Sequence, residues 1–205
     1  MIRSSLIALL CASTLALGGC RSLQVSYAPS SAAAPAPNGT QVVVKVADAR
    51  PSDDGGGTGD VGKVRSGMGI PSTLTDKDPN VVKRTVQEAT LDALKHAGIT
   101  AGNGKTLEAT VKEFWMDGYM GYKGSVTVVY TLKDAAGKTL WTRTVTGADG
   151  GSNAFRDSFS MTEEIFRNAL TEVSANATKE FQSADFQAAA KEGAAAPAAE
   201  APAAQ

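Results

Sequence analysis

The chain has 205 residues, with 20 lysines and arginines against 21 aspartates and glutamates, and its formal net charge is −1. A balance this even provides no field that would attract nucleic acid or an anionic surface, so we expect no nucleic-acid partner. After Cys20 no apolar run approaches the ~20 residues that a membrane-spanning helix needs, so contact with a membrane must be made in another way.

The first twenty residues have the organisation of a bacterial export signal. Arg3 gives a positive start, and residues 6–17 form an apolar stretch too short to span a bilayer. The motif Leu17-Gly18-Gly19-Cys20 resembles the lipobox of bacterial lipoproteins. This resemblance implies that residues 1–19 are a signal peptide that is removed, and that Cys20 then carries diacylglycerol and a further acyl chain such as palmitate. The alternative is an ordinary cleaved signal followed by an incidental cysteine.

The two ends of the mature chain predict a tether and a tail. Residues 20–40 comprise the lipidated cysteine and a stretch rich in Ala, Ser and Pro, which predicts a flexible tether to a domain formed by residues 41–182. Residues 183–205 are rich in Ala and Pro, which predicts a disordered tail. Position 21 is Arg rather than Asp. By resemblance to enteric lipoprotein sorting, this implies an outer-membrane protein whose domain faces the periplasm.

Hydrophobic periodicity in the middle of the chain predicts four main strands and two helices. The pattern shifts near Glu113, which predicts a bulge. Asp78 and Gly98 are a start and a stop signal for the first helix, and Ser160-Met161-Thr162-Glu163 matches a capping box for the second. In chain order we expect a strand at 41–47, a long loop at 52–69 with a short strand at 61–64, a helix at about 79–97, strands at 106–116, 124–132 and 139–146 with a hairpin turn at 134–138, and a helix from 160.

This order predicts an α+β fold, a two-layer sandwich in which a mixed four-stranded sheet carries two helices on one face. A right-handed crossover makes the first two main strands parallel, and an antiparallel meander follows. The motifs at residues 42–50, 61–65, 91–99 and 137–141 resemble the YajG-type bacterial lipoproteins. That family has no assigned activity, so the resemblance implies a lipoprotein but no reaction.

The glycine-rich loop after the first strand holds the candidate ligand residues. Asp53, Asp54 and Asp60 lie on a pliable backbone that could bring carboxylates to Ca²⁺, although the spacing is not that of an EF-hand and a solvated polar loop is the favoured alternative. Asp48 and Arg50 are two residues apart and share a face of a strand. They could pair and anchor the loop, which we favour, or bind a ligand. We expect no cofactor and no resident metal.

Sequence motifs for catalysis are missing. His96 is the only histidine and sits in a last helical turn, where a cation caps the helix, and the chain has no Gly-x-Ser-x-Gly motif. Gly104-Lys105-Thr106 and Gly137-Lys138-Thr139 lack the earlier glycine and the following helix of a phosphate-binding loop, so each predicts a turn. We therefore predict no enzymatic activity. A hydrolase that uses paired carboxylates is the minor alternative, since such acids can be far apart in sequence.

The segment from Phe114 to Tyr122 is the candidate contact surface. Its apolar and aromatic residues predict either core packing or a partner-binding patch, without a preference between the two. The leading hypothesis is a domain that binds or scaffolds an envelope protein complex, and the alternative is a module that binds a small ligand or Ca²⁺ through the loop at 48–69. The candidate contact residues are Phe114, Trp115, Met116, Tyr119 and Tyr122.

Overall fold

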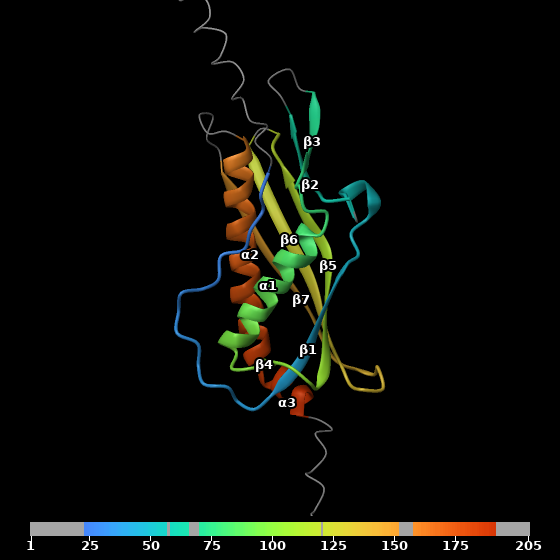
Figure 1. Cartoon of the computed structure of the whole chain (residues 1–205), viewed down its shortest axis with the longest axis vertical. Helices are drawn as coiled ribbons and strands as arrows, with labels where there is room; N and C mark the ends of the chain where they lie inside the picture. The colour runs from blue at the N-terminus through green and yellow to red at the C-terminus, as the bar shows by residue number, and fades with distance from the viewer. Residues whose placement is uncertain (1–22, 57, 66–69, 120, 152–157, 192–205) are drawn as a thin grey trace, which may run out of the picture.

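The computed structural model describes residues 23–56, 58–65, 70–119, 121–151 and 158–191, and within them helices pack against one mixed sheet (Figure 1). The predicted signal peptide and its motif, Leu17 to Cys20, lie outside the described residues. The strands are β1 (Gln41–Asp48), β2 (Asp60–Arg65), β3 (Pro71–Thr75), β4 (Thr100–Ala101), β5 (Lys105–Asp117), β6 (Tyr122–Lys133) and β7 (Thr139–Gly151). The helices are α1 (Val81–His96), α2 (Ser158–Gln182) and α3 (Ala184–Lys191), with one short 3₁₀ turn at Ser52–Asp54.

The long strand β5 organises the sheet. On one edge it pairs antiparallel with β6, which pairs in turn with β7, so the predicted meander is confirmed. On its other edge β5 is shared, because β1 runs parallel to residues 105–111 and β2 runs parallel to residues 116–117. The parallel pairing of β1 with β5 and the register shift between Val111 and Glu113 were both predicted from the sequence.

The α+β class and the mixed sheet are confirmed, but the prediction of four strands is wrong, because the described residues form seven. The additional strands are β4, which extends the sheet beyond β1, and the β2–β3 hairpin, of which only part was expected. β3 reads Pro-Ser-Thr-Leu-Thr and follows a glycine-rich segment, so it has only one large apolar side chain to signal a strand.

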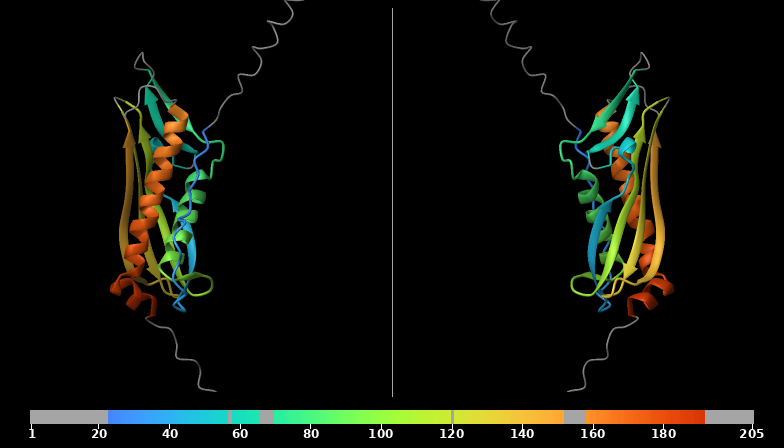
Figure 2. Two further views of the ribbon diagram at one scale, coloured as in Figure 1. Left: turned by 90° about the vertical axis from the view of Figure 1, so that its left-hand side faces the viewer. Right: turned by 90° about the vertical axis from the view of Figure 1, so that its right-hand side faces the viewer.

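Both long helices cover the same face of the sheet and pack on each other (Figure 2). Buried side chains of the helices pack against those of the sheet. The Phe114 ring of β5, for example, stacks on the Phe166 ring of α2 with centroids 4.5 Å apart. The described part of the chain contains no helix that is both long and apolar enough to cross a membrane. The helical side chains of this core, as the periodicity predicted, are Val82, Val86, Ala89 and Ala93 of α1 and Phe166, Leu170, Val173 and Ala177 of α2.

The first helix ends as its sequence predicts. Gly98 has a φ of 72°, the left-handed conformation that glycine adopts without strain. The N–H of Ile99 then donates to the carbonyl of Leu94 at 2.9 Å, which closes a Schellman motif. At the other end the helix begins at Val81, and Asp78 accepts a hydrogen bond from the N–H of Asn80 at 2.8 Å.

The segment at residues 23–40, here called the strap, is packed against the domain rather than free. Leu23, Val25 and Tyr27 are buried in the core, so the prediction of a flexible tether is wrong for these residues. The backbone N–H of Val25 donates to Asp76 at 2.7 Å, and that of Gln24 donates to Glu163 at 3.0 Å. An alternating Leu-x-Val-x-Tyr run supplies the apolar side chains, but its partners lie far along the sequence and could not be read from it.

The predicted C-terminal tail is also ordered at its beginning. α3 occupies residues that the composition assigned to a disordered segment, and it does so because Phe186 is fully buried. The Phe186 ring meets the edge of Trp141, with centroids 4.8 Å apart. One aromatic side chain thus folds an alanine-rich stretch back onto the sheet.

A carboxylate on α1 holds the middle of the strap. Asp92 is buried, and its Oδ2 accepts hydrogen bonds from the hydroxyl of Tyr27 at 2.5 Å and from the N–H of Ser30 at 3.1 Å. Burial, followed by the bond to Asp92, raises the pKa of Tyr27, so this hydroxyl keeps its proton and remains a donor. The strap is therefore fixed to the helix by polar contacts as well as by its apolar side chains.

His96 fastens the later part of the strap. Its Nδ1 lies 2.8 Å from the carbonyl oxygen of Asp92, and its Nε2 lies 3.1 Å from the carbonyl oxygen of Ala32. Both ring nitrogens can donate only when the imidazole is protonated. Hydrogen bonding to the carbonyls of Asp92 and then of Ala32 accordingly raises the pKa of His96, so this histidine holds the strap best in its charged form.

Candidate functional site

The face of the sheet opposite α1 and α2 is not covered by any other described element, and it is rich in threonine. Strand alternation places the apolar side chains of β5, β6 and β7 toward the helices and their polar neighbours toward this open face. Side-chain hydrogen bonds tie the face together, and Thr127 contacts both Glu113 and Thr146 at 3.2 and 3.1 Å. The threonines in β5 to β7 that point to this side are Thr106, Thr110, Thr127, Thr131, Thr142, Thr144 and Thr146.

Strand geometry divides the candidate contact segment between the two faces. Phe114 and Met116 have no exposed surface, so their assignment as possible partner contacts is wrong and they belong to the core. Trp115 lies between them on the open face and is half-buried. The division follows from the two-residue repeat of a strand, in which consecutive side chains point to opposite sides.

The two tyrosines of the segment lie at the end of the sheet. Tyr119 sits in the turn between β5 and β6 with 49% of its surface exposed, and Tyr122 opens β6 and is half-buried against the core. Tyr119 is thus accessible to a partner, whereas Tyr122 mainly packs within the domain. Two of the five predicted contact residues, Trp115 and Tyr119, therefore remain as candidates for an external surface.

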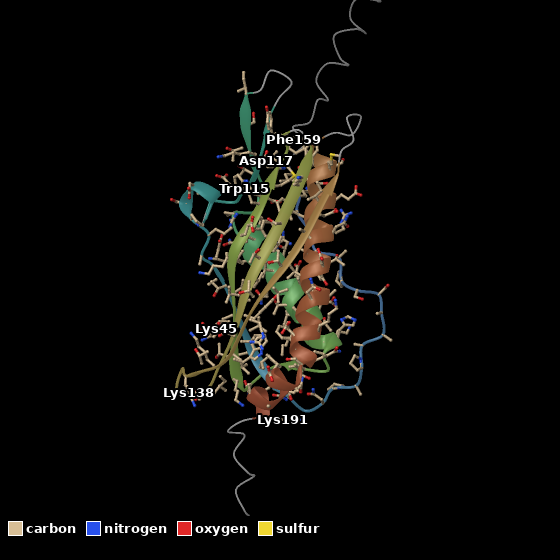
Figure 3. The ribbon with its side chains drawn as sticks, turned by 180° about the vertical axis from the view of Figure 1, so that it is seen from behind. Lys45, Trp115, Asp117, Lys138, Phe159 and Lys191 are labelled. Atoms are coloured by element: carbon tan, nitrogen blue, oxygen red, sulfur yellow. The ribbon has the colours of Figure 1, made fainter. Side chains whose placement is uncertain are left out.

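A shallow hollow of about 670 Å³ lies beside Trp115 on the open face. It forms because the residues that follow Trp115 across the sheet, Ser125 and Ala148, are small and leave the side of the indole ring uncovered. The Nζ atom of Lys63 lies 5.6 Å from the centroid of the ring, a cation–π distance that orients the indole. Figure 3 shows Trp115 and Asp117 near one end of this face.

The outer edge of the sheet is less accessible than its open face. β7 is an edge strand, and side chains of α2 reach over its free backbone groups. Glu172 accepts the N–H of Ala148 at 2.8 Å, and the amide of Asn176 donates to the carbonyl of Thr146 at 3.2 Å. These contacts occupy groups that an added strand would need, so the open face is the better candidate for binding.

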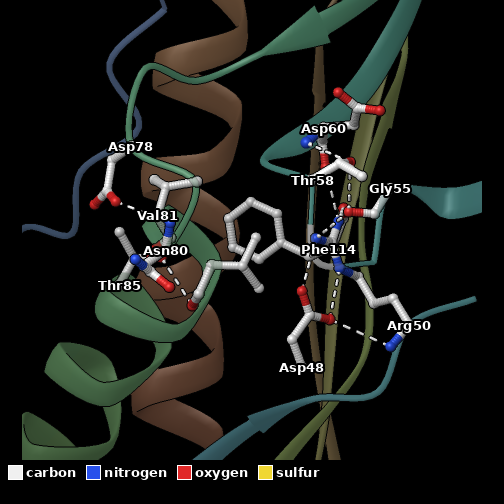
Figure 4. Close-up of polar contacts among 11 residues, drawn as sticks. Asp48, Arg50, Gly55, Thr58, Asp60, Asp78, Asn80, Val81, Thr85 and Phe114 are labelled. Carbon is white, nitrogen blue, oxygen red and sulfur yellow. Dashed lines mark hydrogen bonds and ion pairs between the residues drawn. The ribbon is translucent and has the colours of Figure 1, made fainter. Parts of the chain in front are cut away.

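Arg50 anchors the loop that follows β1, as the favoured interpretation of the Asp48 and Arg50 pair predicted (Figure 4). Its guanidinium forms a bidentate ion pair with Asp48, with both N···O distances at 2.9 Å. The remaining donors bind the carbonyl oxygens of Gly55, Asp60 and Phe114 at 2.9–3.1 Å. All five N–H groups of this buried side chain are thus used within the protein.

The position of Arg50 explains why it is needed. β1 leaves the edge of β5 after Asp48, and β2 joins the same edge only at Met116. The carbonyl of Phe114 lies between these two pairings, and the Arg50 guanidinium donates to it in place of a strand. A buried carbonyl without a donor would destabilise the fold, so the arginine completes the sheet.

The acidic side chains of the loop that the structure describes do not gather into a metal site. Asp60 accepts a hydrogen bond from the hydroxyl of Thr75 at 2.8 Å, and Asp53 is exposed. The side chain of Asp54 lies outside the described parts of the structure. Within the ranges that the structure describes, no three His, Cys, Asp or Glu side chains come together in a way that could hold an ion.

A second hollow, of about 920 Å³, lies at the opposite end of the sheet and was missed by sequence reasoning. Both Gly-Lys-Thr turns border it, Lys105 at the start of β5 and Lys138 before β7, together with Lys191 at the end of α3. The Nζ atom of Lys105 donates to the carbonyl of Ala190 at 2.6 Å and so caps α3. These lysines meet only because the sheet brings distant turns together.

Comparison with protein-family models gives no match, and no curated protein sequence matches the chain either. Solved structures do match. A Xanthomonas campestris protein described as belonging to the family DUF330 is 19% identical, with a TM-score of 0.50, and the match covers 78% of this chain and 96% of that one. A minor lipoprotein from Acinetobacter baumannii is 12% identical, with a TM-score of 0.42 over 70% of this chain and 92% of that one. The first of these likenesses shows a shared fold.

Proposed function

We propose that the chain is a lipid-anchored outer-membrane protein of the YajG type, with no enzymatic activity, whose domain faces the periplasm and binds a protein of the cell envelope. The anchor is supported by the resemblance of residues 17–20 to a lipobox. The domain that would hang from it is α+β, and its fold is shared with a DUF330 protein.

The observation that carries the proposal is the position of Trp115. An indole on an uncovered sheet face, beside a hollow floored by Ser125 and Ala148, offers a large rigid side chain and a neighbouring space to a complementary surface. Tryptophan is enriched among the residues that contribute most to protein–protein binding. The hydroxyl-rich surroundings supply a polar rim of the kind that encloses such anchors.

The proposal that the chain has no enzymatic activity is supported by the structural contacts of Arg50, Asp48 and His96. Arg50 and Asp48 are occupied by the contacts that anchor the loop. Both ring nitrogens of His96 are engaged in holding the strap, through the carbonyl oxygens of Asp92 and Ala32, and the Asp92 carboxylate lies 3.4 Å from Nδ1. Arg50, Asp48 and His96 thus each have a structural contact that accounts for them.

The test is photocrosslinking in living cells with benzoylphenylalanine in place of Trp115. The same probe is placed at two control positions. Thr144 lies on the open face, and Leu91 lies on the outer side of α1, away from that face. We expect one envelope protein to crosslink at position 115, weakly or not at all at position 91, and not in a Cys20→Ser background that lacks the anchor. Equal capture at positions 115 and 91 would show that no specific partner binds this face.

A stability control separates binding from folding. Because Trp115 is only half-buried, Trp115→Ala should leave the melting temperature within a few degrees of the wild type, while the crosslinked partner is lost from neighbouring positions. A large fall in melting temperature would instead assign the indole to the core of the fold.

A further inference from the structure

The strap leaves little chain between the proposed lipid anchor and the folded domain. Leu23 has no exposed surface, and it lies only three residues after Cys20. Three residue steps span at most about 11 Å, even when fully extended. If Cys20 is lipidated, as proposed above, the domain must therefore lie against the membrane rather than stand away from it.

The β2–β3 hairpin extends from the level of Leu23 toward the membrane, over a greater distance than the three residue steps from Leu23 to Cys20 can span. Leu23 is level with Asp76, to which it is bridged, and Asp76 follows the last residue of β3. From Asp76 back to Pro71, at the tip of the hairpin, an extended chain rises about 17 Å. A bilayer surface that holds the lipid on Cys20 is then reached by the hairpin as well.

Exposed apolar side chains gather at this end of the domain. Among the described residues three large hydrophobic side chains are exposed, and two of them, Ile70 and Tyr119, lie here. Ile70 precedes the first residue of β3, and Tyr119 occupies the turn after β5, whose last residue is paired with Lys63 of β2. Phe159, in the first turn of α2, lies at the same end (Figure 3). We call Ile70 and Tyr119 the anchor-side rim.

We infer that the anchor-side rim rests in the interface of the membrane that carries the lipid anchor, so that the long axis of the sheet points away from the bilayer. The inference rests on the proposed lipidation of Cys20. Tyrosine favours the boundary between headgroups and acyl chains, where its ring is buried and its hydroxyl is hydrated. Ile70, with 58% of its surface exposed, gains from the same transfer. The rim thus limits the rotation of a domain that the lipid alone would leave free to turn.

The competing orientation lays the helix layer flat on the membrane. A short link between Cys20 and Leu23 permits it, and Leu91, exposed on α1, would then face the lipid. That orientation leaves the rim in water and buries charged side chains of α1 such as Lys95 and Glu88 against the bilayer, which is unfavourable. The two arrangements predict opposite environments for Leu91 and Tyr119.

The experiment places an environment-sensitive dye at single cysteines in the mature, lipidated protein. Cys11 is lost with the signal and the thiol of Cys20 is consumed by the lipid, so an introduced cysteine is the only reactive one. Tyr119→Cys reports on the rim, Leu91→Cys on the helix layer, and Ala136→Cys on the hairpin turn at the far end. Each labelled protein is reconstituted into vesicles of phosphatidylethanolamine and phosphatidylglycerol, and lipids brominated in the acyl chain serve as quenchers.

We expect a several-fold rise in emission and strong quenching at position 119 only. If the mass of the protein confirms the lipid but the dye at position 119 remains in water, the membrane contact of the rim is refuted and the lipid anchor is not. Shielding at position 91 instead would establish the flat orientation. A mass without lipid on Cys20 would overturn both the anchor and the inference that rests on it.

Discussion

Replacement of Arg50 by methionine is expected to destabilise the domain strongly. The change removes an ion pair whose two side chains are almost fully buried and leaves the Asp48 carboxylate without its partner. Breaking a buried pair from one side costs about 3–5 kcal/mol. The carbonyl of Phe114 loses its donor as well, which contributes to the same loss. Since domains are stable by only about 5–15 kcal/mol, the variant should lie near the limit of folding.

This loss can be measured by urea unfolding of the unlipidated Cys20→Ser form, with circular dichroism as the signal of unfolding. Lys45→Met, on the exposed side of β1, is the matched control and should change the free energy of unfolding by less than about 0.5 kcal/mol. The double variant Asp48→Leu/Arg50→Met should be more stable than Arg50→Met alone, because it leaves no unpaired buried charge. A loss below about 1 kcal/mol for Arg50→Met would refute the structural role and reopen this pair as a ligand site.

Two further predictions concern the strap and the packing of α2. The raised pKa of His96 means that its contribution is complete below the unfolded pKa of about 6.5 and is lost as the pH rises through the folded value. Hydrogen exchange of residues 23–32 should therefore quicken relative to β5 as the pH rises, after correction for intrinsic rates, and His96→Gln should abolish this dependence. A Cβ at Gly147 would lie 2.1 Å from the carbonyl oxygen of Ala169. Gly147→Ala should then cost about 1–3 kcal/mol in thermal or chemical unfolding, whereas Thr146→Ala on the open face should be near neutral, and equal effects would contradict the close packing.

Local signals predicted the parts of the fold that local physics decides. The change of pattern at Glu113 indicated the bulge, and Gly98 indicated the end of α1. The apolar stripe of α2 was legible because its repeat extends over several turns. In each case the residues that determine the structure lie within a few positions of one another.

The strap and the β2–β3 hairpin could not be predicted in the same way. Leu23, Val25 and Tyr27 alternate over only five positions, and their partners Asp76 and Asp92 come from a distant part of the chain. Composition then favoured a tether, because most of the neighbouring residues are alanine, serine and proline. Whether this segment is ordered depends less on its overall apolar content than on the three side chains that are buried in the core.

The candidate site could be predicted from the sequence only in part. The composition of the segment from Phe114 to Tyr122 indicates an aromatic cluster but does not separate its core residues from its contact residues. Strand alternation does separate Phe114 and Met116 from Trp115, because consecutive side chains of a strand point to opposite faces of the sheet. By contrast, the hollow beside Trp115 depends on Ser125 and Ala148, which only the pairing of β5, β6 and β7 brings alongside the indole.

The shared edge of β5 also leads to an expected order of folding. β6 returns to β5 after a short turn, whereas β1 lies about 60 positions before the residues with which it pairs. Closing the longer loop costs more chain entropy, so we expect the antiparallel meander to form before β1 and β2 pair with β5. β1, β2 and the Arg50 guanidinium are then expected to join that edge later. Arg50, which completes the sheet, is therefore expected to make its contacts late in folding and to lie outside the folding nucleus.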